Sequence, residues 1–326
     1  MPTHGPVAHS RTALVALHHL SPAPDQLIVV SDSPATSEDP GILPPSTTLT
    51  HVPFRSGPAI ARNHGAGLAT CDILLFVDAD VVVRPDLIQR IRSLFEDNPS
   101  LSAVFGSYDT NPGDPGFLSQ YRNLLHHYVH QRGNEHASTF WAGLGAVRRD
   151  AFHAMHGFDT SYGVPSIEDI ELGCRLNASG HSIRLVKDLQ AQHLKRWTAL
   201  SMLRTDLFCR GIPWTRLVLS RRLATNDLSL DRIARLSTLA CAVAVASLVI
   251  ALRFPIVLAA TAAALVSLIL MNRHFYAFLT RVRGPGFALC AIPWHAVFYL
   301  VCGFAALLGM ALHFHLRILG SRPSHA

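Results

Sequence analysis

The alternation of apolar and polar stretches predicts that the first part of the chain forms an α/β domain. Short apolar runs predict strands at residues 26–30, 48–52, 72–77, 102–105 and 181–188. Segments between them predict helices at residues 11–20, 58–69, 86–97, 119–131 and 167–180. Residues 138–152 predict a loop, a strand and a helix in turn. Because strands and helices alternate, we expect a parallel sheet covered by helices.

The second part of the chain is dominated by long apolar runs. They cover residues 236–252, 254–271 and 287–312, and each is close to the roughly 20 residues that a membrane-spanning helix needs. A soluble helical domain is the alternative. We therefore expect four parts, listed by residue number: a globular domain at 1–215, a basic juxtamembrane segment at 216–235, a transmembrane region of about three helices at 236–316, and a tail at 317–326.

Charge supports this division. Up to Lys195 the chain has 14 Lys and Arg against 19 Asp and Glu, whereas from Arg196 onward it has 14 against 3. Arginines precede the first apolar run and separate the second run from the third, which predicts a cytoplasmic globular domain on a multi-pass protein of the inner membrane. The basic excess suits lipid headgroups. A nucleic-acid partner is not expected, because no basic stretch is interleaved with aromatic residues.

The cysteines and the N-terminus argue against a secreted protein with disulfides and against a zinc-binding protein. The six cysteines are widely spaced, without a C-x-x-C pair or histidines at zinc spacing. We therefore expect neither disulfides nor a zinc site, and a reducing compartment. The first residues lack the uninterrupted apolar core of a signal peptide.

The stretch LLFVDADVVVRPD places two acids, Asp78 and Asp80, directly after the apolar run at 72–77. Carboxylates are costly to bury unless a cation or a hydrogen-bond donor compensates them. In open α/β sheets, ligands bind at the carboxyl ends of the strands. The two acids therefore predict a metal site at this end of the sheet, with a solvated acidic loop as the alternative.

Six blocks follow one another in a recognisable order: IVVSDSP, SGPAIARNHGAGLA, CDILLFVDADVVVRPD, FWAGLGAVRRDAF, GFDTSY and IEDIELGCRLNASG. Their order and spacing over residues 11–214 resemble family 2 glycosyltransferases of the GT-A fold. The D-x-D motif alone is weak, but D-x-D followed by E-D-x-E-L-x-x-R-L is specific. The resemblance implies a Rossmann-like α/β domain that uses a nucleotide-sugar donor. The apolar tail also resembles the membrane anchors of bacterial members.

The resemblance implies a metal site for Mg²⁺ or Mn²⁺. By it, Asp80 is the direct ligand, Asp78 reaches the ribose or the water shell of the metal, and His193 completes the site. Such an ion neutralises charge as it develops on the departing diphosphate, and oxygen ligands suit it. His193 as an ordinary surface residue is the alternative.

Other residues are assigned to the donor by the same resemblance. Asp32 matches the acid that hydrogen-bonds the nucleotide base, although S-D-S-P here carries one acid where two are usual. Arg55 and Arg62 match phosphate or ribose contacts. For both arginines the alternative is a solvated position on the surface.

The acceptor side needs a general base that takes a hydroxyl proton during attack on the anomeric carbon. Asp169 matches the base of the family, with Glu168 beside it, and direct attack would invert the anomeric centre. Acids that merely complement a helix dipole are the alternative. Trp141 and Gly143 match a loop that faces the sugar, with Trp141 as a plain core residue as the alternative. Four nearby histidines, His126, His127, His130 and His136, are expected to form a partly buried polar face.

The start of the chain departs from the family pattern. Family members begin with an apolar strand in the centre of the sheet, but MPTHGPVAHS has no strand signal. A sheet without that strand would expose backbone donors and acceptors. The first strand is therefore apparently missing, either because it was lost or because the recorded start lies downstream of the true one, which we favour.

These observations predict a membrane-anchored, metal-dependent, inverting glycosyltransferase acting in cell-envelope polysaccharide synthesis. The expected donor is a UDP-sugar, and the expected acceptor is a lipid or a lipid-linked glycan. A Q-x-x-R-W signature of processive synthases is absent, the nearest stretch being RGIPWTRL, so single transfers are expected. Two alternatives are a phosphatase resembling the haloacid dehalogenases, which also carry D-x-D, and a catalytically inactive membrane scaffold of the same fold.

Overall fold

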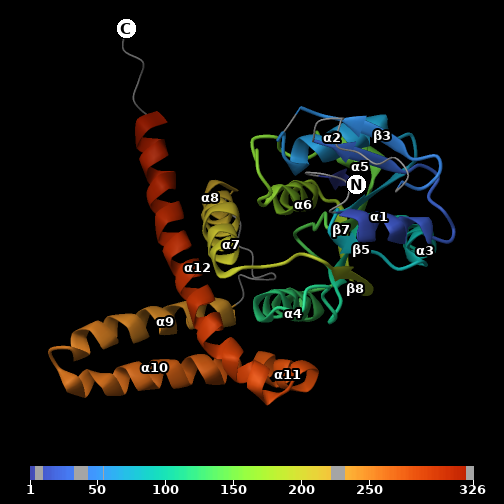
Figure 1. Ribbon diagram of the computed structural model, residues 1–326. Coiled ribbons are helices and arrows are strands. Elements are labelled where there is room, and N and C mark those ends of the chain that lie inside the picture. The colour runs from blue at the N-terminus through green and yellow to red at the C-terminus, as the bar shows by residue number, and fades with distance from the viewer. Residues whose placement is uncertain (4–9, 33–42, 54, 222–231, 321–326) are drawn as a thin grey trace, which may run out of the picture. The chain divides into compact units, whose positions relative to one another are not determined.

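The computed structural model describes residues 1–3, 10–32, 43–53, 55–221 and 232–320 (Figure 1). The chain divides into two compact units, Met1–Arg196 and Trp197–Ala326. Residues 222–231 of the predicted juxtamembrane segment, with Arg222, and residues 321–326 of the predicted tail, with Arg322, lie outside the described residues.

The first unit contains two sheets. The smaller sheet is parallel and has the order β1-β2-β3, with β1 at Pro2–Thr3, β2 at Ile28–Ser31 and β3 at Thr48–His51. The larger sheet has the order β4-β7-β6-β8-β5. Its strands are β4 (Ile73–Val77), β5 (Val81–Val82), β6 (Leu101–Tyr108), β7 (Leu144–Arg148) and β8 (Ser182–His193).

The larger sheet is mixed, so the expectation of a parallel sheet was wrong here. Strand β7 runs antiparallel to both β4 and β6, while β6 and β8 are parallel. After the helix that follows β6, the chain returns to the carboxyl end of β4, where Leu144 pairs with Val77. From that position β7 has to run back against its neighbours. Alternating strands and helices in a sequence do not reveal such a return.

The N-terminus also corrects the sequence prediction in part. Residues Pro2 and Thr3 form a short strand that pairs in parallel with Val30 and Ser31. The amino group of Met1 donates a hydrogen bond of 2.9 Å to the Ile28 carbonyl. A strand signal was missed because two residues are too few to show a pattern.

Among the described residues of the first unit, six helices surround the sheets: α1 (Arg11–His18), α2 (Pro58–Leu68), α3 (Leu87–Asp97), α4 (Phe117–Arg132), α5 (Arg149–Ala154) and α6 (Glu168–Ala178). Strand β4 is covered on both faces because successive side chains point to opposite sides. Leu74 and Phe76 pack in a core with α2, whereas Val77 packs in a core with α1 and α3. The nearly continuous apolar run at 72–77 is what such a doubly covered strand requires.

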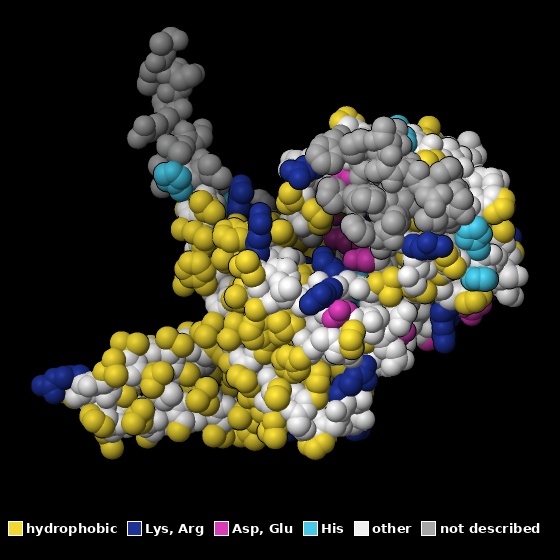
Figure 2. Space-filling view, in the orientation of Figure 1, with side chains coloured by type: hydrophobic (Ala, Val, Ile, Leu, Met, Phe, Trp, Pro, Cys, Tyr) yellow, Lys and Arg dark blue, Asp and Glu magenta, His cyan; other side chains and the backbone are white. Residues whose placement is uncertain are grey.

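The described part of the second unit consists of helices joined by short turns. It contains α7 (Ala199–Arg204), a π-helical turn at Thr205–Gly211, α8 (Ile212–Arg221), α9 (Arg232–Ala251), a 3₁₀ turn at Pro255–Val257, α10 (Leu258–Met271), α11 (Arg273–Arg283) and α12 (Pro285–Gly320). Two helices, Arg232–Ala251 and Pro285–His315, are long and apolar enough to cross a membrane. The pair α10 and α11, bent by 62°, would make a third span. Figure 2 shows apolar side chains over much of the visible surface of α9 and α10.

Residues 273–283, expected to be a loop between spans, form the amphipathic helix α11. Phe275, Tyr276 and Leu279 are buried along one side, while Arg281 and Arg283 end the helix. The arginines of this segment favour a loop in a count of charges, whereas its apolar residues have the spacing of one helix face.

A polar cluster joins three helices of this unit. The Asn272 amide nitrogen, between α10 and α11, donates 2.9 Å to the Ser237 hydroxyl of α9. The Tyr299 hydroxyl of α12 donates 2.9 Å to the Asn272 amide oxygen. Hydrogen bonds between helices of this kind stabilise helix packing in apolar surroundings.

Candidate active site

The two acids of the D-x-D motif lie in a turn directly after β4. The Asp78 amide donates 3.2 Å to the Gly143 carbonyl, and the Val81 amide donates 3.1 Å to the Asp78 carbonyl. Strand β5 then pairs with the end of β8, placing Val81 opposite His193. A strand, a tight turn and a short antiparallel pair thus place three predicted site residues, Asp78, Asp80 and His193, in one region.

Asp80 and His193 are direct neighbours. His193 Nε2 lies 3.6 Å from Asp80 Oδ2, and the His193 side chain is 7% exposed against 40% for Asp80. The imidazole is stacked on the Tyr108 ring, with ring centroids 4.1 Å apart. His193 is therefore a buried residue held in place by an aromatic contact, and it is not the surface residue that the alternative proposed.

The pKa of Asp80 is held below its ordinary value. Burial acts to raise the pKa, but the hydrogen bond and the charge of His193, with Lys195 behind it, outweigh burial. Asp80 is thus an ionised carboxylate, whose oxygens suit Mn²⁺ or Mg²⁺, and the neighbouring imidazole can offer a nitrogen ligand in its neutral form. The described part of the chain has no cluster of three or more His, Cys, Asp or Glu at metal-binding distance. An ion bound by Asp80 and His193 would take further ligands from water or substrate phosphates, as Mg²⁺ commonly does.

Arg62 connects the D-x-D motif to helix α6. Its Nη2 lies 2.6 Å from Asp78 Oδ1 and its Nη1 lies 2.7 Å from Glu168 Oε1. The Arg62 and Glu168 side chains are each 5% exposed, so each charge depends on the other for compensation. The sequence placed Arg62 at the donor phosphates or ribose, and it did not suggest these ion pairs, because Glu168 is 106 positions away.

Asp169 differs from Glu168 in its surroundings. Both carboxylate oxygens of Glu168 have hydrogen-bond donors, because the first accepts from Arg62 and the second accepts 2.9 Å from the Ser166 amide. Asp169 Oδ2 accepts 3.1 Å from the Ala142 amide, and Oδ1 accepts 2.8 Å from the Ile170 amide. Burial and the charge of Glu168 raise the pKa of Asp169 to about 7, against the opposing effect of Arg62. A carboxylate with a pKa near neutrality is suited to general acid–base chemistry.

The loop at residues 141–143 lies between the two sets of acids. The Gly143 carbonyl accepts from Asp78, and the Ala142 amide donates to Asp169. Trp141 is half-buried and makes an edge contact with Tyr108, with centroids 4.8 Å apart. A Cβ at Gly143 would overlap the Trp141 ring, so glycine is required for this loop conformation.

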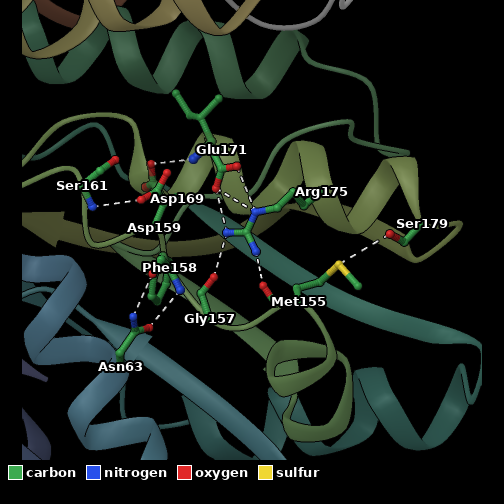
Figure 3. Close-up of polar contacts among 11 residues, drawn as sticks. Asn63, Met155, Gly157, Phe158, Asp159, Ser161, Asp169, Glu171, Arg175 and Ser179 are labelled. Carbon is green, nitrogen blue, oxygen red and sulfur yellow. Dashed lines mark hydrogen bonds and ion pairs between the residues drawn. The ribbon is translucent and has the colours of Figure 1, made fainter. Parts of the chain in front are cut away.

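Helix α6 is fixed by contacts that the sequence did not suggest (Figure 3). Arg175 Nη2 lies 2.7 Å from Glu171 Oε2 and also donates 2.7 Å to the Gly157 carbonyl. The Asn63 side chain makes two hydrogen bonds of 2.8 Å with the Phe158 backbone. These bonds hold the G-F-D segment between α2 and α6. The signals available were the Arg of E-L-x-x-R-L and the Asn that follows Arg62.

The remaining predicted residues lie at the end of β2. Asp32 is buried, its amide donates 3.2 Å to the Thr3 carbonyl, and its carbonyl accepts 3.3 Å from the Arg55 amide. Arg55 is exposed and has a φ of 59°. The structure therefore brings Asp32 and Arg55 together through their backbones.

Two of the clustered histidines face β6, as expected for a partly buried polar face. The Nδ1 atoms of His127 and His130 lie 2.7 and 3.0 Å from the Tyr108 and Gly106 carbonyls.

Comparison with known proteins identifies the domain that carries this site. Residues 11–155 match the family model described as glycosyl transferase family 2. The chain carries a family 2 glycosyltransferase domain. As a glycosyltransferase it is not the phosphatase considered as an alternative. No curated protein sequence matches this glycosyltransferase.

Solved structures extend the likeness to the fold. A mannosyltransferase, PcManGT from Pyrobaculum calidifontis in complex with GDP-Man and Mn²⁺, is 16% identical, with a TM-score of 0.53 over 96% of this chain and 85% of that chain. TarS residues 1–349 from S. aureus is 14% identical, with a TM-score of 0.47 over 72% of this chain and 67% of that chain. The match to the mannosyltransferase structure, together with the family 2 model, gives this glycosyltransferase the GT-A fold. Its C-terminal helices are long and apolar enough to span a membrane.

Proposed function

We propose that this glycosyltransferase moves a sugar from a nucleoside-diphosphate donor, a UDP-sugar in the first instance, to a hydroxyl of a lipid or a lipid-linked glycan. The reaction depends on Mg²⁺ or Mn²⁺ and inverts the anomeric centre. Asp78, Asp80, His193, Asp32 and Arg55 form the donor side, and Asp169 is the general base.

One observation carries the proposal: the loop at residues 141–143 bonds both to Asp78 and to Asp169. The acids assigned to the donor and the base assigned to the acceptor therefore lie on the two sides of one short loop. A transferase needs this proximity, because the attacking hydroxyl, the anomeric carbon and the leaving diphosphate have to lie in line. Trp141, at the start of the loop, offers a ring against which a sugar can pack.

Different residues of the chain accept the proton, hold the ion and position the acids. Asp169 accepts the proton of the acceptor hydroxyl as its oxygen forms a bond to the anomeric carbon. The bond from that carbon to the diphosphate oxygen breaks on the opposite face, which inverts the centre. Asp80 and His193 would hold a divalent ion, which when bound would supply positive charge for the leaving diphosphate. Arg62 fixes Asp78 and Glu168, so that both sides of the site keep their geometry.

The donor class is supported by the fold neighbour from Pyrobaculum calidifontis, which is described as a complex with GDP-Man and Mn²⁺. Asp32, the one acid of the S-D-S-P stretch, is the residue that would recognise the nucleotide base. The lipid acceptor is supported by the apolar helices α9 and α12, which would hold the enzyme at a bilayer. Arginines at residues 232, 235, 273, 281 and 283 favour a cytoplasmic catalytic domain.

The test is a panel of radiolabelled UDP-, GDP- and TDP-sugars incubated with membranes that contain the full chain. We expect one donor to label the lipid fraction and to release free nucleoside diphosphate, and we expect Asp169→Asn to stop both. A scaffold without activity would leave every donor intact, and calorimetry would then show no Mn²⁺-dependent binding of UDP or GDP. Labelling by Asp169→Asn at the rate of the unaltered enzyme would refute the assigned base.

A further inference from the structure

The ring of Tyr108 lies against two residues that the proposed function uses. It is stacked on the His193 imidazole, with ring centroids 4.1 Å apart and an angle of 11° between the planes. It also meets the Trp141 ring at an angle of 83°, with centroids 4.8 Å apart. His126 of α4 adds a third ring, 4.5 Å away. Tyr108 is 8% exposed, so close packing restricts its ring to one orientation.

The backbone that carries Tyr108 extends beyond one of its neighbours in the sheet. The pairing of β6 with β7 ends at Phe105, whereas β6 continues to Tyr108. On the other side, the pairing of β6 with β8 shifts in register between Phe105 and Ser107. The sheet therefore holds this end of β6 less regularly than the rest of the strand, and its buried carbonyls need other donors.

Helix α4 supplies these donors from one of its faces, because positions 123, 127 and 130 lie on the same side of a helix. Three contacts reach the end of β6 and the residue after it: His130 Nδ1 lies 3.0 Å from the Gly106 carbonyl, His127 Nδ1 lies 2.7 Å from the Tyr108 carbonyl, and the Asn123 amide donates 2.7 Å to the Asp109 carbonyl. A carbonyl can only accept, so both imidazoles carry a proton on Nδ1. The helix thus fixes the backbone on either side of the Tyr108 ring.

The His193 side chain needs a contact of this kind. Its backbone is fixed, because Val81 pairs with it and its carbonyl accepts 2.8 Å from the Gly113 amide. Neither interaction fixes the rotation about the side-chain bonds, which decides whether Nε2 faces Asp80. The stacked Tyr108 ring restricts that rotation. Imidazoles that bind metals are commonly oriented by neighbours that do not touch the metal, and losing such a neighbour weakens metal binding by roughly 10–100-fold.

We propose that Tyr108 is a positioning residue: its ring aligns His193 with Asp80 for a divalent ion, and the face of α4 that bears His127 and His130 holds the ring in place. The inference rests on the proposed function, because it takes Asp80 and His193 as ligands of that ion. Tyr108 acts on the ion only through the imidazole. Two of the clustered histidines of α4 thereby gain a role in the site without binding metal themselves.

The test measures Mn²⁺ binding directly, on the full chain in detergent. Electron paramagnetic resonance of free Mn²⁺ gives the dissociation constant of Mn²⁺ alone, without donor or acceptor. We expect Tyr108→Leu to raise this constant about tenfold, and Tyr108→Phe, which keeps the stacked ring, to change it by less than about twofold. The matched control Tyr128→Leu removes a ring that lies 5.5 Å from the Arg132 guanidinium, and it should leave the constant unchanged.

A double-mutant cycle separates positioning from a general loosening of the fold. If Tyr108 acts through the imidazole, Tyr108→Leu should add less than about a twofold effect in a chain that already carries His193→Ala. A second variant, His127→Leu, keeps the Tyr108 ring but removes the donor to its carbonyl, so it should raise the constant by roughly two- to fivefold. His136→Leu, at an exposed position after α4, is its control. His127→Leu also provides the test if Tyr108→Leu does not fold.

The outcomes separate this inference from the proposed function. Equal Mn²⁺ binding by the unaltered enzyme, Tyr108→Leu and His127→Leu would overturn the positioning role, and so would a loss of about tenfold that persists without the His193 imidazole. The proposed function would stand in both cases. If the unaltered enzyme bound no Mn²⁺, the metal-dependent mechanism itself would fail, and the inference with it.

Discussion

Arg62 and Glu168 form a buried ion pair, with Nη1 of the arginine 2.7 Å from Oε1 of the glutamate. The same guanidinium bonds Asp78 at 2.6 Å, so one side chain of α2 ties the end of β4 to the start of α6. A surface arginine would have no such effect. The arrangement makes the position of α6, and with it Asp169, dependent on Arg62.

Removing this guanidinium should destabilise the protein strongly. Arg62→Met leaves the buried carboxylate of Glu168 without a cationic partner, and breaking a buried pair in this way costs about 3–5 kcal/mol. The matched control is Arg90→Met, which removes the exposed ion pair with Asp188 and should cost about 1 kcal/mol or less. Chemical denaturation in detergent, followed by tryptophan fluorescence, measures both. If both variants lost the same free energy of unfolding, the buried ion pairs of Arg62 would contribute no more to stability than an exposed pair.

The rate of transfer should depend on pH through Asp169. The pKa of this group is raised to about 7, and the base has to be ionised, so the rate should be high above pH 7 and fall below it. At one unit below the pKa roughly a tenth of the base is ionised, so a decrease of about tenfold is expected at pH 6. Because Arg62 lowers the pKa of Asp169, the milder variant Arg62→Lys should move the midpoint less than Arg62→Met, which should move it to higher pH. A rate that stays constant from pH 5.5 to 8 would exclude Asp169 as the base.

Chelation should stop the reaction, and Mn²⁺ should restore it. Asp80→Asn and His193→Ala should each raise the Mn²⁺ concentration needed for half of the restored rate, by roughly 10–100-fold. Asp188→Asn, which alters a side chain that is 82% exposed, serves as the control and should leave the requirement unchanged. Full activity in excess EDTA would contradict the metal-dependent mechanism.

Two glycines on helices should respond oppositely to alanine. A Cβ at Gly173 of α6 would overlap the backbone of Thr139 and Phe140, just before the 141–143 loop, so Gly173→Ala should destabilise by about 1–3 kcal/mol and reduce transfer. A Cβ at Gly67, near the end of α2, meets no atom within 4 Å. Gly67→Ala should therefore be neutral or add up to about 1 kcal/mol of stability. Melting curves of both variants decide this, and loss of stability in both would point to a general sensitivity of the helices.

The elements around the site were predictable because local signals agree there. Strand β4 is a nearly continuous apolar run ending at Asp78, and α2 begins with Pro58 at a position that tolerates a missing N–H. Helix α6 ends just before Gly180, whose φ of 82° suits glycine. In each case the residues that decide the element are adjacent in sequence.

What the sequence did not reveal depends on contacts between distant segments. The direction of β7 follows from the path of the chain after α4, and the ion pairs of Arg62 join residues on three separate elements. The burial of His193 depends on Tyr108, which no motif marks. Contacts between residues far apart in the sequence leave no local pattern from which they could be predicted.

The hydrogen bonds of Asn272 also impose an order on the biogenesis of the C-terminal helices. Ser237 is synthesised before Asn272 and can accept from its amide nitrogen as soon as α9 and α10 lie together. The amide oxygen has to wait for Tyr299, on the helix that emerges last. A polypeptide truncated after α11 would therefore lack the Tyr299 hydroxyl that donates to this amide oxygen, whereas the final helix completes the cluster.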